Sequence, residues 1–551
     1  MPRHRTRLVT LAATGVAVAF LGLVLSGGRA ATGRFSDVSP EYPYAPAIIE
    51  LADRAIVNGH HDLTFDPEAP VLRQQFAKML TATFGFEVSE ADRCSFADVS
   101  VGGPNTLYPD NYIAVCVSRG IIRGTTATRF SPYDKLTRAQ MISLVVRAVD
   151  SLAGGPLPAP KGRGTSSWGG SDPEHGASIQ WAESEGLLNG LPLDTLDPRG
   201  FATRGEVAQV LHNVEQDVRY YGVRADGVTD DSKAITNAMD GAAAAKSPLH
   251  FGPGTYVLKN ELTPPDGVTL IGSGPSSVLY MPELPGSSQT FIFERSNPKN
   301  ITIRDFTLRG DGPTMNESGL YLVGARDSTL KNLRLEDLRY GMKLGEAHQQ
   351  AQRWTIEDIS ATNCRTPMYI QDVEDSAFTR MSLQGVAVDH AFDHCLYMSE
   401  GCYRLTFTDV TLVGGGGYGL HLFRGSRGTT SYVTFNNLTI DATTGRWPMC
   451  ITDGFSNIAF HHVNLRMLID EVCIRVTGCD NILFDGLTAS GGHAVIGTFA
   501  GQRAGHITLK VVAYDEPSIL SPNPGARGIT DLVVESATRT STGTLIPQER
   551  R

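Results

Sequence analysis

The sequence predicts a multidomain protein in which a small α-helical triple-repeat module precedes an all-β solenoid with an N-terminal helical cap. Two repeats predict this arrangement: one of 65 to 66 residues before residue 215, and a strand-type repeat of 22 to 29 residues after residue 300. The length of 551 residues also favours at least two folding units, because one compact core seldom serves so long a chain.

Residues 1–30 have the pattern of a signal peptide. Arginines at the N-terminus precede an apolar run from Leu8 to Leu25, and Gly28 and Ala30 offer a small-x-small cleavage site. We therefore expect secretion, with no membrane partner after cleavage. The alternative is an uncleaved membrane anchor, for which the apolar run is long enough.

Composition argues against two classes of ligand. The formal net charge is −10 and no basic stripe compensates for it, so a nucleic-acid partner is not expected. The chain has no Cys-x-x-Cys motif and no clustered histidine spacing, so a structural metal site is not expected either.

The eight cysteines of an exported chain permit disulfides. Cys94 and Cys116 lie outside the solenoid and are the expected pair. Cys450 and Cys473 are about one coil apart and could meet by stacking, whereas Cys473 with Cys479 is the rival pair. The spacing leaves that choice open.

The triple repeat keeps its register over three sets of positions. A glycine, a proline and an arginine recur in every copy: Gly59, Gly124 and Gly190; Pro67, Pro132 and Pro198; Arg73, Arg138 and Arg204. Each copy pairs an apolar helix pattern with a second one that opens LRQQ, TRAQ or TRGE. With FSDV at Phe35 and FADV at Phe96, the segment from about 35 to 215 resembles three S-layer homology repeats, at 31–95, 96–150 and, in degenerate form, 151–215.

This resemblance implies a cell-wall anchor on the outside of the cell. In that family three repeats hold an anionic secondary cell-wall polymer, and the resemblance assigns Arg73, Arg138 and Arg204 to the binding grooves. Guanidinium suits the role because it makes paired hydrogen bonds to carboxylates. Alternatively, these arginines only neutralise helix ends or neighbouring acids.

A second resemblance begins at Tyr221. The segments YGVRADGVTDDSKAI, from Tyr221 to Ile235, and HFGPGTYVL, from His250 to Leu258, resemble the opening of pectate-lyase-superfamily and polygalacturonase-type proteins. The resemblance implies a right-handed parallel β-helix over about 216–551. Thr229 is expected to cap a short helix that closes the open end of the solenoid.

The strand-type repeat predicts the coils of this solenoid. Its pattern, apolar-x-x-apolar-x-apolar, begins at nine anchor positions: Ile303, Leu330, Ile356, Phe378, Phe407, Phe435, Phe460, Phe484 and Leu509. Nine anchors predict about nine coils. A glycine precedes several anchors by six residues (Gly324, Gly401, Gly454 and Gly478), which predicts tight corners with positive φ.

Four motifs point to an active site. ITDG at Ile451, IDEVCI at Ile469, SGGHAVIGT at Ser490 and GARGIT at Gly525 resemble, in order, the catalytic motifs of polygalacturonases. That family hydrolyses glycosidic bonds with inversion, which needs an acid and a base carboxyl roughly 6.5 to 9.5 Å apart. The resemblance assigns Asp470 as general acid, Asp453 and Glu471 as water-holding acids, His493 as their support and Arg527 as the partner of a uronate carboxylate.

The motifs depart from the family pattern, so other functions stay open. Ile451 replaces an asparagine, Glu471 an aspartate and Ala494 a glycine, and Val472 separates the acids from Cys473. One alternative to the glycoside hydrolase is a polysaccharide lyase, with a Lys, Arg or Tyr base and often calcium. The other is a non-catalytic glycan-binding or surface-coat protein.

Polar residues on the strands before the corners are a further candidate surface. Lys343, Tyr369, Arg475 and His421 alternate with apolar neighbours and are expected to face outward, where they could line a groove for an acidic sugar chain. The segment DHAFDHCLY at Asp389 suggests metal or acid–base chemistry, but a loop or strand edge with hydrogen-bonded histidines is the simpler expectation.

Overall fold

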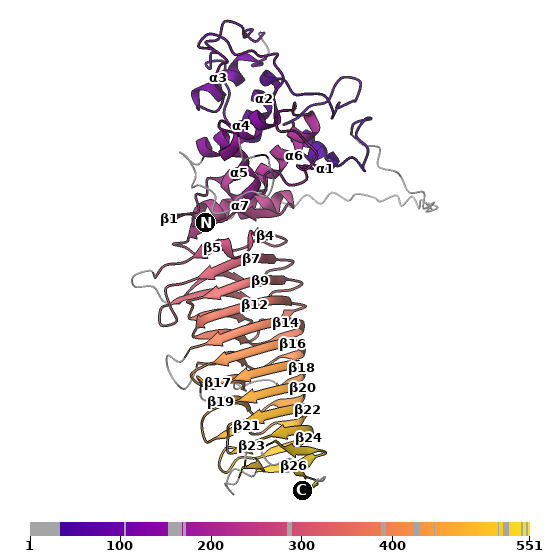
Figure 1. Ribbon diagram of the computed structural model, residues 1–551, viewed down its shortest axis with the longest axis vertical. Helices are drawn as coiled ribbons and strands as arrows, with labels where there is room; N and C mark the ends of the chain where they lie inside the picture. The colour runs from indigo at the N-terminus through magenta and orange to yellow at the C-terminus, as the bar shows by residue number, and fades with distance from the viewer. Residues whose placement is uncertain are drawn as a thin grey trace, which may run out of the picture.

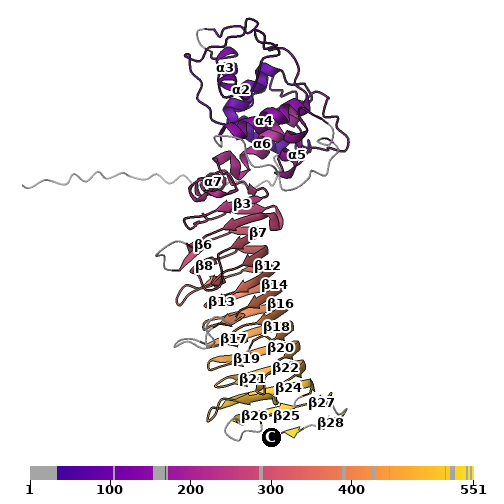
Figure 2. The same cartoon turned by 60° about the vertical axis from the view of Figure 1, so that its left-hand side comes forward.

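The structure is a computed structural model that describes residues 34–550 apart from 104–105, 153–167, 169–171, 284–288, 387–392, 424–428, 446, 516, 522–527, 541–543 and 547–548. The expected signal peptide therefore lies outside the described residues. A helical module occupies one end of the molecule and a stack of strands extends away from it (Figures 1 and 2).

The helical module contributes two helices per repeat: α1 (Ala45–Asp53), α2 (Arg73–Thr83), α3 (Asp110–Ser118), α4 (Arg138–Leu152), α5 (Gly176–Ser184) and α6 (Arg204–Glu215). The second helix of each repeat begins at the recurring arginine. One hydrophobic core, with Leu51, Phe76, Ile142 and Val207 at its centre, joins all three repeats into a single unit. None of the helices in the described ranges is long and apolar enough to cross a membrane.

A helix closes the solenoid as expected, but its cap differs. The helix α7 (Ser232–Ala245) lies between the module and the first strands (Figure 1), and packs Ile235 and Met239 into the solenoid core. The prediction that Thr229 caps it is wrong: Asp231 is the N-cap residue, and the Thr229 hydroxyl instead donates to Asp226 at 2.8 Å.

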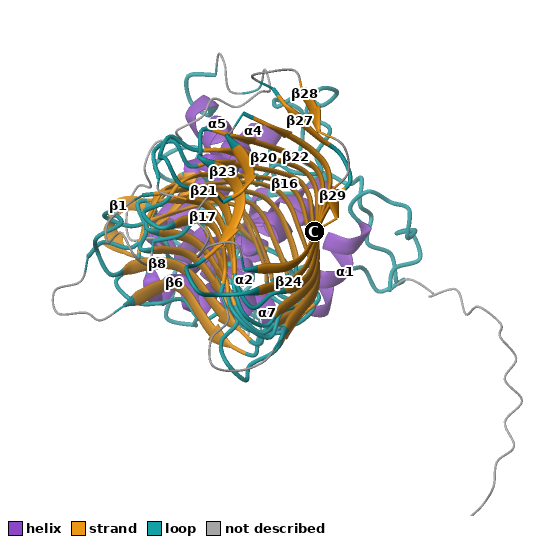
Figure 3. Ribbon diagram, turned by 90° about the horizontal axis from the view of Figure 1, so that it is seen from below, coloured by secondary structure: helices purple, strands orange, loops and turns teal. Residues whose placement is uncertain are grey.

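The solenoid has two main sheets, on different sides of its axis (Figure 3). The larger comprises β1 (Asp226–Asp230), β2 (Leu249–Phe251), β3 (Gly254–Val257), β4 (Thr269–Gly272), β5 (Ser277–Tyr280), β7 (Thr302–Arg309), β9 (Thr329–Glu336), β11 (Ala351–Gln352), β12 (Thr355–Cys364), β14 (Val373–Gly385), β16 (Tyr403–Gly414), β18 (Thr430–Asp441), β20 (Phe455–Arg466), β22 (Asp480–Ser490), β24 (Ala504–Tyr514), β26 (Ile529–Val534), β27 (Ala537–Arg539), β28 (Thr544–Ile546) and β29 (Glu549–Arg550). The ten-stranded sheet comprises β6 (Thr290–Ser296), β8 (Glu317–Val323), β10 (Tyr340–Leu344), β13 (Thr366–Ile370), β15 (Leu396–Met398), β17 (Tyr418–Leu422), β19 (Trp447–Ile451), β21 (Val472–Val476), β23 (Ala494–Thr498) and β25 (Ser518–Leu520).

The nine predicted anchors are confirmed as one register row of the larger sheet. Each pairs directly with the next, from Ile303 with Leu330 through to Phe484 with Leu509. Within the row, Phe378, Phe407, Phe435, Phe460 and Phe484 stack at 4.4 to 5.0 Å between ring centroids. Stacked rings therefore fill the interior of these five consecutive coils.

The solenoid has about 12 turns across residues 226–539, so the prediction of about nine was too low. The register row continues before Ile303 to Leu270 and Leu249, and after Leu509 to Val534. The two N-terminal turns were missed because β2 and β4 are only three and four residues long and lack the full six-residue pattern.

The corner glycines are confirmed. Gly324, Gly401, Gly454 and Gly478 have φ of 64°, 78°, 79° and 58°. At Gly478 a Cβ atom would overlap the carboxylate of Asp453 in the preceding coil. The position therefore needs glycine both for its backbone conformation and for the close approach of the next coil.

The expected disulfides are wrong, because all eight cysteines are thiols. Cys116 is buried and its thiol donates to the carbonyl of Ala77 at 3.7 Å. In the solenoid, Cys450 pairs in register with Arg475 and not with Cys473, whose sulfur lies 3.5 Å from that of Met467. Seven of the eight cysteines therefore act as small buried side chains, and Cys94 is partly exposed.

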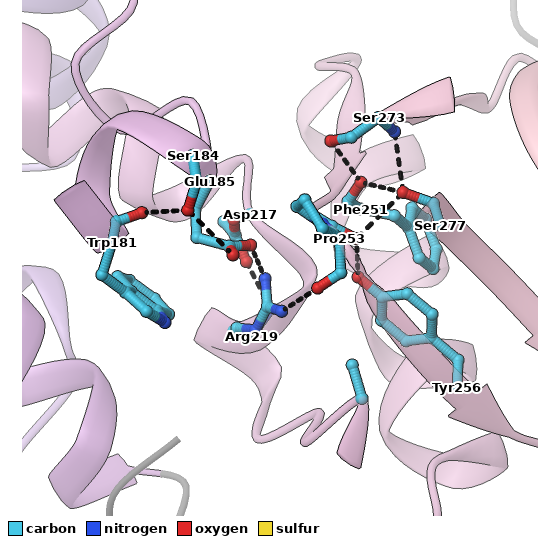
Figure 4. A network of polar contacts seen from close by, with 12 residues as sticks. Trp181, Ser184, Glu185, Asp217, Arg219, Phe251, Pro253, Tyr256, Ser273 and Ser277 are labelled. Carbon is cyan, nitrogen blue, oxygen red and sulfur yellow. Dashed lines mark hydrogen bonds and ion pairs between the residues drawn. The ribbon is translucent and has the colours of Figure 1, made fainter. Parts of the chain in front are cut away.

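A buried ion pair joins the module to the solenoid (Figure 4). Arg219, in the 3-10 helix η1 (Val218–Tyr221), pairs with Glu185 at the end of α5, and both side chains are at most 3 % exposed. On the solenoid side, Arg219 Nη2 donates to the carbonyl of Pro253 at 3.0 Å. A Cβ at Gly252 would overlap the Glu185 carboxylate, so the first coil approaches this pair as closely as the backbone allows.

A second acid lies beside the pair. The backbone N–H of Arg219 donates to Asp217 Oδ1 at 2.7 Å, and burial raises the pKa of Asp217 to about 7. Arg219 is therefore the cation of a junction that contains two buried carboxyl groups.

We predict that Arg219→Met destabilises the junction, because it leaves Glu185 buried without a counter-charge. The expected loss in unfolding free energy is about 3–5 kcal/mol, read by urea unfolding with tryptophan fluorescence, to which Trp181 beside Arg219 contributes. Arg380→Met is the control, since Arg380 and Asp358 are 49 % and 36 % exposed and such pairs contribute less than about 1 kcal/mol. Equal losses in both variants would contradict the prediction.

Candidate functional site

One row of aromatic and basic side chains runs along the outside of the ten-stranded sheet. Its members pair in register from strand to strand: Tyr321, Lys343, Tyr369, Tyr397, His421 and Arg475, with Cys450 between the last two. Their neighbours along the strands, such as Met342 and Leu344, are fully buried, so this aromatic–basic row faces outward. At a strand spacing of about 4.8 Å, its six steps span about 29 Å.

Contacts along the row keep the side chains in place. The Lys343 ammonium lies 4.7 Å from the Tyr321 ring centroid and 5.7 Å from that of Tyr369. The rings of Tyr369 and Tyr397 stack at 5.1 Å with an interplanar angle of 18°. These contacts hold flat aromatic faces and a cation on one surface before any ligand arrives.

A pocket of about 160 Å³ lies at the C-terminal end of the row, lined by Glu471, Val472, Arg475, His493, Phe499 and Ser521 among others. Arg475 forms an ion pair with Glu471, and its guanidinium lies 4.8 Å from the ring of Trp447 and 5.2 Å from that of Phe499. The pocket therefore combines a carboxylate, a cation and an imidazole.

Asp470 lies at the edge of this pocket. Its carboxylate is 3.5 Å from His493 Nδ1, and its side chain is 92 % exposed. The structure thus brings together Asp470, Glu471 and His493, three of the four residues assigned as catalytic from the sequence.

Asp453 does not join them, and this corrects the sequence-based site. The register pairs Ile451 with Val476, so Asp453 follows the C-terminal end of its strand, whereas Asp470 precedes β21. The coil here is 25 residues long, as the pairing of Met449 with Ile474 shows, but Asp453 and Asp470 are 17 positions apart. The five-residue strand β21, about 13 Å long, therefore lies between the two positions.

Arg527, the expected uronate partner, lies outside the described residues. Arg475 occupies the pocket and offers the same chemistry.

A histidine pair in the middle of the row was not predicted from the sequence. His394 lies just before β15, and its Nε2 is 2.9 Å from Nδ1 of His421; its Nδ1 accepts a hydrogen bond from the backbone N–H of Tyr418 at 3.0 Å. The expectation of a hydrogen-bonded histidine at a strand edge holds for His394. Tyr321 and Tyr397 were not predicted either. Each lies about one coil length from Lys343 or Tyr369 in the sequence, and this spacing could have identified them.

The three recurring arginines of the module lie between repeats. Arg73 donates to the carbonyls of Phe130 and Arg123, and Arg204 makes the equivalent bonds to Phe65 and Asn58. Both guanidinium groups also lie over the phenylalanine ring, at 4.7 and 4.3 Å.

Arg138 differs from the other two. It forms two hydrogen bonds to the Glu206 carboxylate, at 2.9 and 2.7 Å, and these side chains are 12 % and 5 % exposed. Gln75 and Gln140 occupy the position of Glu206 in the other repeats. Only in the third repeat is this position an acid, so Arg138 already has a carboxylate partner.

The Arg73 groove contains a cavity of about 290 Å³. Its lining is rich in cationic side chains and includes Arg73, Arg123, Gln140, Arg147, Glu174 and His175. Such a lining suits an anionic ligand.

Comparison with known protein families matches both parts of the chain. The S-layer homology domain matches residues 34–77, 105–142 and 168–208, and the rhamnogalacturonase A/epimerase, pectate lyase-like family matches residues 216–299.

Curated relatives share only part of their length with the chain. Exoglucanase XynX of Acetivibrio thermocellus is 28 % identical over 187 residues, which cover 33 % of this chain and 16 % of that protein. An S-layer protein of Bacillus thuringiensis subsp. finitimus is 28 % identical over 217 residues, 39 % of this chain and 24 % of that protein. The chain thus spans a quarter or less of either relative.

Among solved structures, the A-module of the mannuronan C-5 epimerase AlgE4 from Azotobacter vinelandii superimposes with a TM-score of 0.46 at 18 % identity, covering 59 % of this chain and 96 % of that one. By the family matches and its own strand pairing, the chain carries three S-layer homology repeats within residues 34–208, followed by a pectate-lyase-like domain and a parallel β-solenoid of about 12 turns.

Proposed function

We propose that this protein is secreted, attaches to the cell wall through its S-layer homology repeats, and binds an acidic polysaccharide along the aromatic–basic row. The observation that carries the proposal is the register of that row, in which six side chains able to contact sugars follow one another on a single outward face. Aromatic faces pack on sugar rings, and Lys343 and Arg475 supply charges for uronate carboxylates.

The reaction proposed for this surface is hydrolysis at the pocket beside Arg475. Asp470 would be the general acid, supported by His493, and Glu471 would activate water. Arg475 would hold the carboxylate of the sugar bound there. The proximity of Asp470, Glu471 and His493 supports this assignment, which no longer includes Asp453.

Elimination is the second candidate. It needs a base, such as a tyrosine, and a cation that neutralises the uronate carboxylate. The row favours it by placing Tyr369 and Tyr397 between Lys343 and Arg475. Calcium, often required by lyases, would then be a cofactor to test. Asp453 lies away from the other three residues assigned as catalytic, which supports a further candidate function, glycan binding without cleavage.

We predict that the Arg73 and Arg204 grooves dominate wall binding. Arg73→Ala with Arg204→Ala in the full-length protein should reduce binding to purified cell walls at least about tenfold, because hydrogen bonds to charged groups contribute about 1.5–3 kcal/mol each. Arg138→Ala with Glu206→Gln is the matched control. It removes both members of the internal pair, leaves no unpaired acid and should retain binding. An equal loss in the control, or full binding to walls stripped of their anionic polymer, would contradict the assignment.

We predict that Tyr369→Ala and Tyr397→Ala each weaken binding of polygalacturonate or alginate at least about fivefold, since buried aromatic contacts at interfaces contribute more than about 1 kcal/mol. Isothermal titration calorimetry measures the affinity. Tyr432→Ala is the control, because Tyr432 is 54 % exposed but lies on β18 of the larger sheet. Equal weakening in the control would show that the glycan binds elsewhere.

For the reaction, Glu471→Gln and Asp470→Asn should lower kcat on a polyuronate at least about 100-fold with little change in binding. Asp453→Asn should keep kcat within about threefold of the wild type. Reducing-end assays measure turnover. Loss of turnover in Asp453→Asn would show that Asp453 belongs to the catalytic site after all. Products with unsaturated, ultraviolet-absorbing ends would show that the reaction is elimination and not hydrolysis.

A further inference from the structure

The histidine pair in the aromatic–basic row has a hydrogen-bond pattern that fixes its protons. His394 Nδ1 accepts from the backbone N–H of Tyr418, so this nitrogen carries no proton. A neutral imidazole has one N–H, which must then be at His394 Nε2, where it donates to His421 Nδ1 at 2.9 Å. His421 in turn carries its proton on Nε2.

The same pattern opposes protonation of either ring. A second proton on His394 would have to displace the Tyr418 N–H, and a second proton on His421 would face the N–H of His394. Burial acts in the same direction: it lowers the pKa of His394 to about 4, and burial followed by repulsion from His394 lowers that of His421. Both imidazoles therefore stay neutral above about pH 5.

The groups around His421 do not offset this effect. Asp393 next to His394 is fully buried and is paired with Arg365. Three groups face the His421 ring: Tyr397 on β15, Tyr418 on β17 and the register partner Cys450 on β19. Burial raises the pKa of each of them, so none carries charge below pH 8.

We propose that His421 is a specificity-determining residue that presents a permanently neutral Nε2–H donor to an oxygen of the bound acidic polysaccharide, and that His394 locks it in this form. The inference rests on the proposed glycan-binding function of the row. Lys343 and Arg475 supply the charge for carboxylates, and His421 supplies a hydrogen bond that does not depend on pH. Affinity for an acidic glycan is thereby constant from pH 5 to 8, although a histidine lies in the middle of the binding surface.

The test uses the full-length protein and oligogalacturonate, whose carboxylates stay ionised over this range. In calorimetry at pH 5, 6, 7 and 8, the wild-type affinity should vary less than about twofold. His394→Phe removes the N–H that faces His421 Nδ1, so the pKa of His421 should rise toward its ordinary value of about 6.5 but stay below it, because burial remains. Affinity should then increase on acidification toward pH 5, as the donor gains a positive charge.

Two further variants serve as controls. His421→Leu should weaken binding about fivefold or more at every pH, because it removes the donor. His506→Gln should change nothing, since His506 is an exposed histidine on β24 of the larger sheet. A wild-type affinity that increases on acidification, or a His421 pKa in His394→Phe that is no higher than in the wild type, would overturn the proposal.

A ligand-independent measurement separates this inference from the proposed function. In protein with 15N-labelled histidine, the ring nitrogens of His394 and His421 should keep neutral-imidazole shifts from pH 5 to 8, with assignments made from the two single variants. A titrating His421 in a protein that binds oligogalacturonate overturns the inference alone. If both histidines stay neutral but the protein binds none of several polyuronates, the proposed ligand is wrong and, with it, the proposed function.

Discussion

The in-register stacking of coils is the constraint on which the rest of this structure depends. Each coil places one apolar anchor directly over the last, and five consecutive phenylalanines form a continuous column in the interior. Because the register is fixed by this column, residues one coil length apart in sequence become neighbours in space. Outward-facing residues are paired in the same register from coil to coil, and this pairing produces the aromatic–basic row.

The same constraint explains how much could be predicted from the sequence. The anchors from Ile303 to Leu509 and the corner glycines follow from local patterns, since buried strand residues and positive φ restrict residue type strongly. Lys343, Tyr369, His421 and Arg475 were found for the same reason. The N-terminal turns were not, because β2 and β4 are too short to carry the pattern.

The candidate catalytic site was harder to predict, because motif order does not fix spatial position. Asp453 belongs to a motif with the expected neighbours, but it falls eight residues short of the 25-residue coil spacing that would place Asp470 over it. Its carboxylate instead lies against the corner at Gly478. The histidine pair was not predicted for the opposite reason, since the bond between His394 and His421 depends on the position of His394 before β15, which no local pattern shows.

The helical module shows how a repeat can keep its fold and change its electrostatics. All three arginines begin a helix and reach the neighbouring repeat, as their common spacing indicates. Glutamate at position 206, where the other repeats have glutamine, gives Arg138 an internal carboxylate partner, whereas Arg73 and Arg204 donate to backbone carbonyls. Through the buried pair of Glu185 and Arg219, this module is attached directly to the first coil, so wall attachment and the outward face of the solenoid belong to one continuous structure.

The central claim is that an acidic glycan binds on the outer face of the ten-stranded sheet. A crystal structure of the full-length protein with a bound oligogalacturonate tests it most directly. We expect sugar rings over Tyr369 and Tyr397, with carboxylates at Lys343 and Arg475. A well-ordered oligosaccharide on the larger sheet, away from this row, would contradict it.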